Sequence, residues 1–254
     1  MDIQSNLGPL CDILLTANRV CSLTGAGISA ESGIPTFRGE EGLWKTYRAE
    51  QLATPTAFIQ DPGLVWEWYD WRRGIIASKK PNAGHKVLAE WEELFPNFAL
   101  ITQNIDGLHQ RAGSKNVIEL HGNIWKHRCI DEKTIIENHD VPLEEIPPHC
   151  KTCGALLRPH VVWFGESLDG SILQQSFLLS SSCDVMLSIG TSAVVQPAAS
   201  LPLSAAEGGA KIIEINPDPT PLTDSADFSF RAKSGEFLPI LDEELKRRMN
   251  KKKE

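Results

Sequence analysis

A glycine-rich run is the first feature of this sequence with the residue types and spacing for chemistry. Residues 25–30, Gly-Ala-Gly-Ile-Ser-Ala, fit the pattern G-x-G-x-x-G/A directly after an apolar run. Glycines at these positions permit a tight turn and let the backbone approach a pyrophosphate, while helix N–H groups point at the anion. The acidic residue that usually binds a ribose about 20 residues later is missing. The chain therefore departs from a standard dehydrogenase at this point.

Three further groups of polar residues suit catalysis or metal binding. His121 ends the apolar run 117–120, and an ordinary histidine pKa of about 6.5 suits a general base. Asn104 and Asp106 follow another apolar run; they could cap a helix, contact a ligand, or do both. Cys150-x-x-Cys153 has the spacing of half a tetrahedral zinc site.

The elements that must position these residues predict an α/β fold with a doubly wound parallel sheet. Four short apolar runs are typical of strands covered on both faces, and helical patterns over 82–94 and 170–180 alternate with them. Each run is followed by polar or glycine-rich residues. Ligands bind beyond the carboxyl ends of such strands, so we expect one site there. The runs span residues 20–24, 98–102, 185–189 and 211–215.

Two stretches interrupt the alternation and predict a second, smaller lobe within a single domain over 1–254. Residues 36–81 are rich in Trp, Tyr, Arg and Glu and indicate helices, and residues 125–158 are polar and carry three of the six cysteines. We expect the larger lobe to hold the sheet. It would comprise about 8–35, 82–124 and 159–245.

Composition limits the class of protein. The 254 residues include 25 Lys and Arg against 33 Asp and Glu, a net charge of −8. This charge argues against nucleic acid or an anionic membrane as the main partner. No apolar run reaches the roughly 20 residues of a membrane helix, and the first ten residues lack a signal-peptide pattern. We therefore expect a cytoplasmic protein with no membrane partner and no direct nucleic-acid binding.

Five motifs together resemble the sirtuins, which are NAD-consuming protein-lysine deacylases. They are GAGISAESGIPTFRG at 25–39, TQNID at 102–106, ELHG at 119–122, VVWFGE at 161–166 and GTS at 190–192. The resemblance covers about residues 10–240. It implies a Rossmann-type sheet and a small lobe made of a helical module and a zinc-binding module, with NAD consumed as a co-substrate.

The resemblance also implies roles for particular residues. His121 would deprotonate a ribose hydroxyl of NAD after the acyl oxygen has attacked the anomeric carbon, and Asn104 would be the second catalytic residue. Asn216 would contact the adenosine ribose in place of the missing acid. An extended substrate peptide would pair with Val161, Val162, Trp163 and Phe164. The implied NAD contacts are Gly25, Ala26, Gly27, Ser29, Ala30, Pro35, Thr36, Phe37, Arg38, Trp44, Gln103, Asn104, Ile105, Asp106, Gly190, Thr191, Ser192, Asn216, Pro217, Asp218 and Ser234.

The zinc module of the family implies two pairs of cysteines. Cys129 lies where the first pair begins, but its partner position holds Glu132. Zinc accepts a carboxylate oxygen, and His127 and Asp131 are nearby substitutes. Two interpretations stay possible. Zinc is bound by Cys129, Cys150, Cys153 and one other ligand, or the site has lost its zinc. A closed site of this kind would be structural.

A third set of residues bears on the acyl group. Tyr69 and Arg72 lie three apart in a helical pattern and share a face, and a guanidinium beside a phenol can bind a carboxylate. With the small residue Ala53, this set resembles class III sirtuins, in which it recognises the distal carboxylate of succinyl-, malonyl- or glutaryl-lysine. The resemblance implies removal of acidic acyl groups, and of acetyl, to give nicotinamide and O-acyl-ADP-ribose.

Two other classes stay open. Gly25-x-Gly27 alone would also suit a nicotinamide-dependent oxidoreductase, which leaves the glycosidic bond of NAD intact. A regulator that binds NAD or ADP-ribose without catalysis is the other class, and the presence of His121 and Asn104 in their motifs argues against it.

Overall fold

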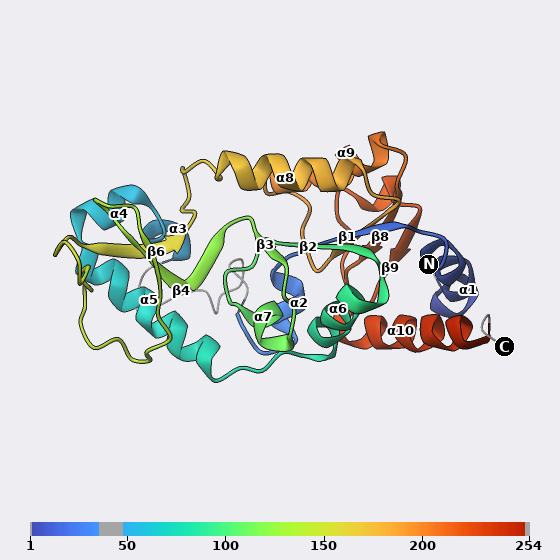
Figure 1. Cartoon of the computed structure of the whole chain (residues 1–254), viewed down its shortest axis with the longest axis horizontal. Coiled ribbons are helices and arrows are strands. Elements are labelled where there is room, and N and C mark those ends of the chain that lie inside the picture. The colour runs from blue at the N-terminus through green and yellow to red at the C-terminus, as the bar shows by residue number, and fades with distance from the viewer. Residues whose placement is uncertain (1, 36–47, 252–254) are drawn as a thin grey trace.

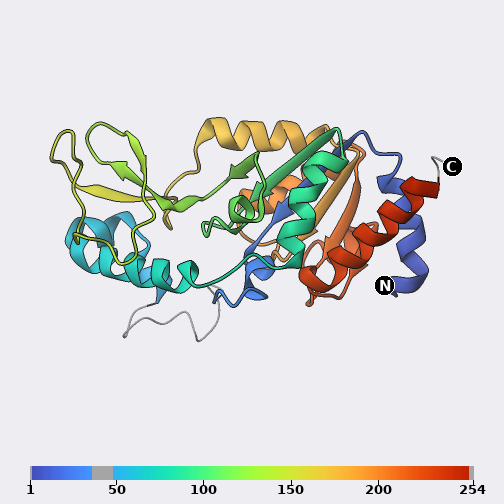
Figure 2. The same ribbon diagram turned by 60° about the horizontal axis from the view of Figure 1, so that its bottom comes forward.

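The structure is a computed structural model that describes residues 2–35 and 48–251. Figures 1 and 2 show a larger lobe that carries both ends of the chain and a smaller lobe at the far end of the long axis. No helix in the two described stretches is long and apolar enough to cross a lipid bilayer.

The large lobe is built on six parallel strands in the order β3-β2-β1-β7-β8-β9. From β1 the chain adds β2 and β3 on one side of the sheet, and from β7 it adds β8 and β9 on the other side. The switch point between β1 and β7 is where a dinucleotide binds in such sheets. The strands are β1 (Arg19–Thr24), β2 (Asn97–Thr102), β3 (Val117–Glu119), β7 (Val185–Ile189), β8 (Lys211–Ile215) and β9 (Phe228–Phe230).

Helices cover both faces of this sheet. Apolar side chains of α1, α6 and α10 pack in one core with alternate strand residues, and the remaining strand residues meet α8 and α9 on the opposite face. All five residues of β7 are buried, as the continuous apolar pattern predicts. The predicted doubly wound α/β fold is confirmed. These helices are α1 (Ile3–Leu14), α6 (Ala83–Leu94), α8 (Gly170–Ser181), α9 (Leu201–Glu207) and α10 (Ser234–Lys251).

Side-chain caps explain where the two predicted helices begin. Asn82 accepts hydrogen bonds from the backbone N–H groups of Gly84 and His85 at the start of α6. Asp169 accepts from those of Ser171 and Ile172 at the start of α8. Each cap satisfies N–H groups that have no partner within the helix.

The small lobe combines three helices with a three-stranded antiparallel sheet of order β5-β4-β6, and its tryptophan-rich core is separate from the other two. The sheet begins at Gly122, before the boundary expected at 125, and ends at Val161, beyond the one expected at 158. The elements are α3 (Ala49–Leu52), α4 (Pro55–Gln60), α5 (Pro62–Ala77), β4 (Gly122–Cys129), β5 (Ile135–Glu137) and β6 (Leu157–Val161).

Arg73 of α5 joins the helices of this lobe to its sheet. Its side chain is fully buried, and its two terminal nitrogens donate to the backbone oxygens of Ile124, Asn138 and Asp140 at 2.9–3.0 Å. Burial lowers the pKa of Arg73 to about 10, so the guanidinium stays charged at neutral pH. This buried cation therefore links the two modules, in addition to the apolar core that they share.

Candidate active site

The glycine-rich turn lies at the switch point, between the carboxyl ends of β1 and β7. The N–H of Gly25 donates to the carbonyl of Ile189, and that of Gly27 donates to the carbonyl of Gly190 at 2.7 Å. A Cβ on Gly27 would lie 2.7 Å from Gly190, and one on Gly25 would lie 2.8 Å from it. Glycine is therefore required at both positions, because the two turns touch backbone to backbone. The short helix α2 (Ala26–Ala30) starts in this turn.

The end of β2 supplies the next polar groups. The Gln103 side chain donates to the Thr191 hydroxyl at 3.0 Å, which links the ends of β2 and β7. The amide nitrogen of Asn104 donates to the carbonyl of Gly25 at 3.0 Å and to the Ser29 hydroxyl at 3.1 Å. These bonds fix the orientation of the Asn104 side chain and leave its oxygen as an acceptor.

His121 lies beside this group because β3 neighbours β2. Its Nδ1 is 2.9 Å from the carbonyl oxygen of Gln103. A carbonyl only accepts, so Nδ1 carries the proton and Nε2 of the neutral ring is unprotonated. Burial lowers the pKa of His121, and the bond to Gln103 acts in the opposite direction. The ring is therefore neutral at pH 7 and can accept a proton at Nε2.

A cavity of about 20 Å³, room for about one water molecule, lies between helix α5 and these polar strand ends. Arg72 lines it together with Ala26, Asn104 and Asp106. The Asp106 carboxylate is buried and accepts from the Ser29 hydroxyl at 2.7 Å, and from a backbone N–H at 2.8 Å. Burial raises the pKa of Asp106, against these hydrogen bonds and the charge of Arg72. Arg72 is 5% exposed, so its charge acts over this cavity with little screening by water.

Tyr69 is connected to the stretch that follows β6. Its hydroxyl accepts a hydrogen bond from the indole nitrogen of Trp163 at 2.9 Å. Burial raises the pKa of Tyr69, while the bond from Trp163 and the charge of Arg72 act to lower it. The carbonyl of Ala53 accepts from the N–H of Phe164 at 2.9 Å. The structure thus brings Ala53 and Tyr69 to the segment predicted to pair with a peptide.

Three cysteines and one glutamate meet in the small lobe. One ligand atom each from Cys129, Glu132, Cys150 and Cys153 lies within 4.8 Å of the others, and two of the sulfurs are 3.5 Å apart. Sulfurs around a zinc at about 2.3 Å would be roughly 3.8 Å apart, so the donors fit a tetrahedral ion. His127 is not among them: its Nε2 lies 3.1 Å from Arg73.

Of the alternatives for the fourth zinc ligand, Glu132 is therefore the one that the described residues favour. Burial and the Arg73 charge lower the pKa of His127 to about 4, which identifies a neutral core histidine. Asp131 is also absent from the group of candidate ligands.

Comparison with known proteins decides the family. A profile described as the Sir2 family matches residues 25–197. The chain belongs to the Sir2 family. It is 59% identical over 219 residues to an "NAD-dependent protein deacylase" of Aquifex aeolicus, covering 86% of this chain and 92% of that one.

Two solved structures extend the comparison to the fold. A Sir2 homologue in complex with NAD superposes with a TM-score of 0.90 at 48% identity, covering 95% of this chain and 94% of that one. A Sir2 protein with a p53 peptide and NAD gives 0.84 at 36% identity, covering 96% and 98%. The Sir2 fold assigned to this chain thus rests on sequence and on structure.

The remaining predicted NAD contacts of this Sir2 chain lie in three places. Residues after β8 form a turn in which the Asn216 amide donates to the carbonyl of Asp218 at 2.8 Å. Ser234 begins α10 and donates to Glu31 at 2.6 Å. Pro35 lines the cavity of Arg72. Thr36, Phe37, Arg38 and Trp44 lie outside the described residues.

The residues present fit NAD and zinc. Polar groups meet at the carboxyl ends of β1, β2, β7 and β8. In the turn at Gly25 and Gly27 there is no space for a Cβ, so the backbone N–H groups of this turn are not covered by side chains of these two residues. The zinc donors are three thiols and one carboxylate, all ligands that zinc accepts. Four protein ligands make a closed site, so zinc would support the module and take no part in the reaction.

Sequence reasoning missed two threonines beneath the site. Thr24 and Thr102 are the last residues of β1 and β2, lie in register, and share a hydrogen bond of 2.8 Å. The Thr102 hydroxyl also accepts from the N–H of Asn104 at 3.1 Å, and Thr24 lies 2.9 Å from His109. The signal available in the sequence was a polar residue ending each of two adjacent apolar strands.

Proposed function

We propose that this Sir2-family enzyme, an NAD-dependent protein deacylase, removes succinyl, malonyl and glutaryl groups as well as acetyl from protein lysines. The products would be free lysine, nicotinamide and O-acyl-ADP-ribose. The observation that carries the proposal is the position of Arg72, a buried guanidinium in the cavity that Asn104 and Asp106 also line. A cation there suits an acyl chain that ends in a carboxylate.

His121 is the proposed general base. Bound NAD would supply an electrophilic ribose carbon and nicotinamide as the leaving group. His121 would accept a hydroxyl proton at Nε2, because Nδ1 donates to Gln103. Asn104 would present its oxygen from an orientation that Gly25 and Ser29 fix. The neutral ring supports this role, since a protonated imidazole cannot act as a base.

Arg72 and Tyr69 are the proposed contacts of the acyl carboxylate. The guanidinium offers several donors in a planar fork, and a phenol that accepts from Trp163 can donate its own proton. The side chain of Ala53 is small and its carbonyl holds Phe164 of the proposed peptide segment, so a bulkier residue at this position would reduce the space for a long acyl chain. A buried and paired carboxylate would bind strongly because little water competes for it.

The substrate polypeptide would bind as an added strand along Val161, Val162, Trp163 and Phe164. The N–H of Val162 donates to the carbonyl of His121 at 2.9 Å, which holds this segment next to the proposed base. The N–H groups of Val162, Trp163 and Phe164 all have partners within the chain, so the added strand would bond chiefly to backbone carbonyls of the segment. Strand addition needs main-chain hydrogen bonds and makes few demands on substrate sequence. The related Sir2 structure with a p53 peptide supports a protein substrate.

Three peptides of one sequence, carrying acetyl-, succinyl- or glutaryl-lysine, would test the proposal. Their NAD-dependent turnover would be followed by mass spectrometry. We expect turnover of all three, with higher kcat/KM for the acids. A clear preference for acetyl would contradict the acidic pocket, and no turnover of any peptide would contradict the deacylase function.

A further inference from the structure

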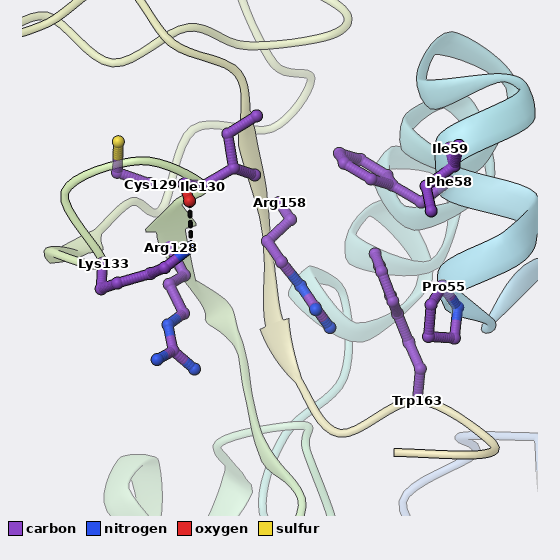
Figure 3. Close-up of a pocket in the computed structure, with 9 residues that line it drawn as sticks. All are labelled: Pro55, Phe58, Ile59, Arg128, Cys129, Ile130, Lys133, Arg158 and Trp163. Carbon is purple, nitrogen blue, oxygen red and sulfur yellow. Dashed lines mark hydrogen bonds between the residues drawn. The ribbon is translucent and has the colours of Figure 1, made fainter.

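We propose that a cavity between α4 and the zinc-binding module binds an acidic segment of the substrate polypeptide, next to the acyl-lysine. The inference rests on the proposed deacylase function and specifies the substrate further. The cavity has a volume of about 330 Å³, within the range of about 300–1,000 Å³ of ligand pockets. Figure 3 shows its lining from α4 on one side and from β4, β6 and the segments after them on the other.

One wall of the cavity is apolar. Pro55, Phe58 and Ile59 come from α4, and the Phe58 ring lies 5.2 Å from that of Trp163. Ile59 is 80% exposed, so its apolar side chain is open to contact by a partner. A bulky apolar side chain of a partner would remove this surface from water.

The other wall is cationic. Arg128 of β4 and Arg158 of β6 are directly opposite in the antiparallel pair, so two like charges extend from neighbouring positions (Figure 3). Like charges opposite each other destabilise a sheet. Arg158 is neutralised by Glu166 at 2.6 Å and stacks 3.6 Å above the ring of Trp163. Arg128 takes part in none of the ion pairs among the described residues.

The charge of the cavity therefore favours an anion. Lys133, whose Nζ donates to the carbonyl of Ile130, adds a second cation to Arg128, and none of the nine described lining residues is acidic. The whole chain carries a net charge of −8, so this cavity is a locally positive region on a negatively charged protein. Acidic side chains beside a bulky apolar one complement both walls.

The cavity is continuous with the proposed peptide-binding edge. Trp163 lines the cavity and directly follows Val162, which bonds to His121. Arg158 and Val162 are four residues apart, roughly 13 Å along an extended strand. An extended substrate spans that distance in about four residues. The acidic segment should therefore lie about three to five residues from the acyl-lysine, and this places the occupant on the substrate itself.

Binding of acyl-lysine peptides without NAD would test the inference by fluorescence anisotropy. One peptide carries Phe and two Asp about four residues before the lysine, a second carries them after it, and a third has Ser and Asn instead. We expect one acidic peptide to bind about tenfold more tightly than the neutral one. Arg128→Gln should remove most of this preference, and Ile59→Ser part of it.

Lys86→Gln provides the matched control. Lys86 is an exposed residue of α6, and its loss changes the net charge equally without touching the cavity. Equal binding of all three peptides, or equal effects of Arg128→Gln and Lys86→Gln, would overturn the inference. If Arg128→Gln fails to fold, Ile59→Ser provides the test. An unchanged preference of that variant for the acidic peptide would overturn the inference.

Turnover with NAD separates this inference from the proposed function. Acidic peptides that bind through the cavity but are never deacylated would contradict only the function. Deacylation at equal kcat/KM for acidic and neutral peptides, with equal binding, would contradict only the cavity.

Discussion

Replacing Arg72 with methionine should separate the removal of acidic acyl groups from the removal of acetyl. Methionine keeps much of the apolar length of the side chain but removes its charge and its N–H donors. Arg72 is 5% exposed and shares its cavity with Asn104 and Asp106. A succinyl carboxylate in that cavity would lose its only proposed cationic partner.

The size of the effect follows from the energy of a charged hydrogen bond. Such bonds contribute about 1.5–3 kcal/mol, and about 1.4 kcal/mol corresponds to a factor of ten. The kcat/KM for succinyl-lysine should fall roughly 10- to 100-fold, mainly through KM. Acetyl-lysine has no distal carboxylate, so its kcat/KM should change little or rise. Asp106 loses a nearby positive charge, so its pKa should rise further, and the KM for NAD must be measured in parallel.

Matched succinyl and acetyl peptides at saturating NAD provide the assay, with mass spectrometry as the readout. Tyr69→Phe should act in the same direction but more weakly. Arg73→Met is the contrast, because Arg73 donates to the carbonyls of Ile124 and Asp140: it should lower thermal stability and both activities together. Equal loss of both activities in Arg72→Met, as in that contrast, would refute the acidic pocket.

Four further predictions concern the base and its pH dependence, the metal and the glycine turn. His121→Ala should lower deacylation by about 10²–10⁴ while the melting temperature and NAD affinity stay near wild type, and near-normal turnover would exclude His121 as the base. Because the base works when neutral and burial lowers its pKa, kcat should fall only below about pH 6.5, and an acid limb above that value would contradict this. Cys150→Ser should abolish a content of about one zinc per chain and lower the melting temperature; a stable, metal-free wild type would show that Glu132 does not complete the site. Gly27→Ala should weaken NAD binding and stability, because its Cβ would meet Gly190 at 2.7 Å, whereas Gly74→Ala, with no atom within 4 Å, should not; equal calorimetric affinities for both would contradict the backbone contact.

The sequence predicted the central strands closely because burial on both faces leaves a clear pattern. The runs expected from 20 and 98 begin one residue earlier, at Arg19 and Asn97, whose exposed side chains carry no apolar signal. Strand β9 was not predicted. It has three residues at the edge of the sheet, too few to show a period.

The convergence of polar residues at one edge of the sheet also followed from the sequence, since parallel strands bring their carboxyl ends together. The orientation of the side chains at this edge did not follow from the sequence. Asp106 accepts from Ser29, a contact that depends on how α2 packs against the end of β2. The position of Glu132 near Cys150 depends on the fold of the small sheet. These contacts join residues far apart in the chain, and no local pattern encodes them.

The relation between NAD cleavage and lysine deacylation tests the central claim most directly. Nicotinamide, deacylated peptide and O-acyl-ADP-ribose would be quantified by mass spectrometry in one reaction of the wild type with a succinyl-lysine peptide and NAD. We expect equal amounts of the three products from the wild type, and deacylated peptide and O-acyl-ADP-ribose formed about 10²–10⁴-fold more slowly by His121→Ala. Deacylated peptide without nicotinamide, or NAD reduced with its glycosidic bond intact, would contradict the account.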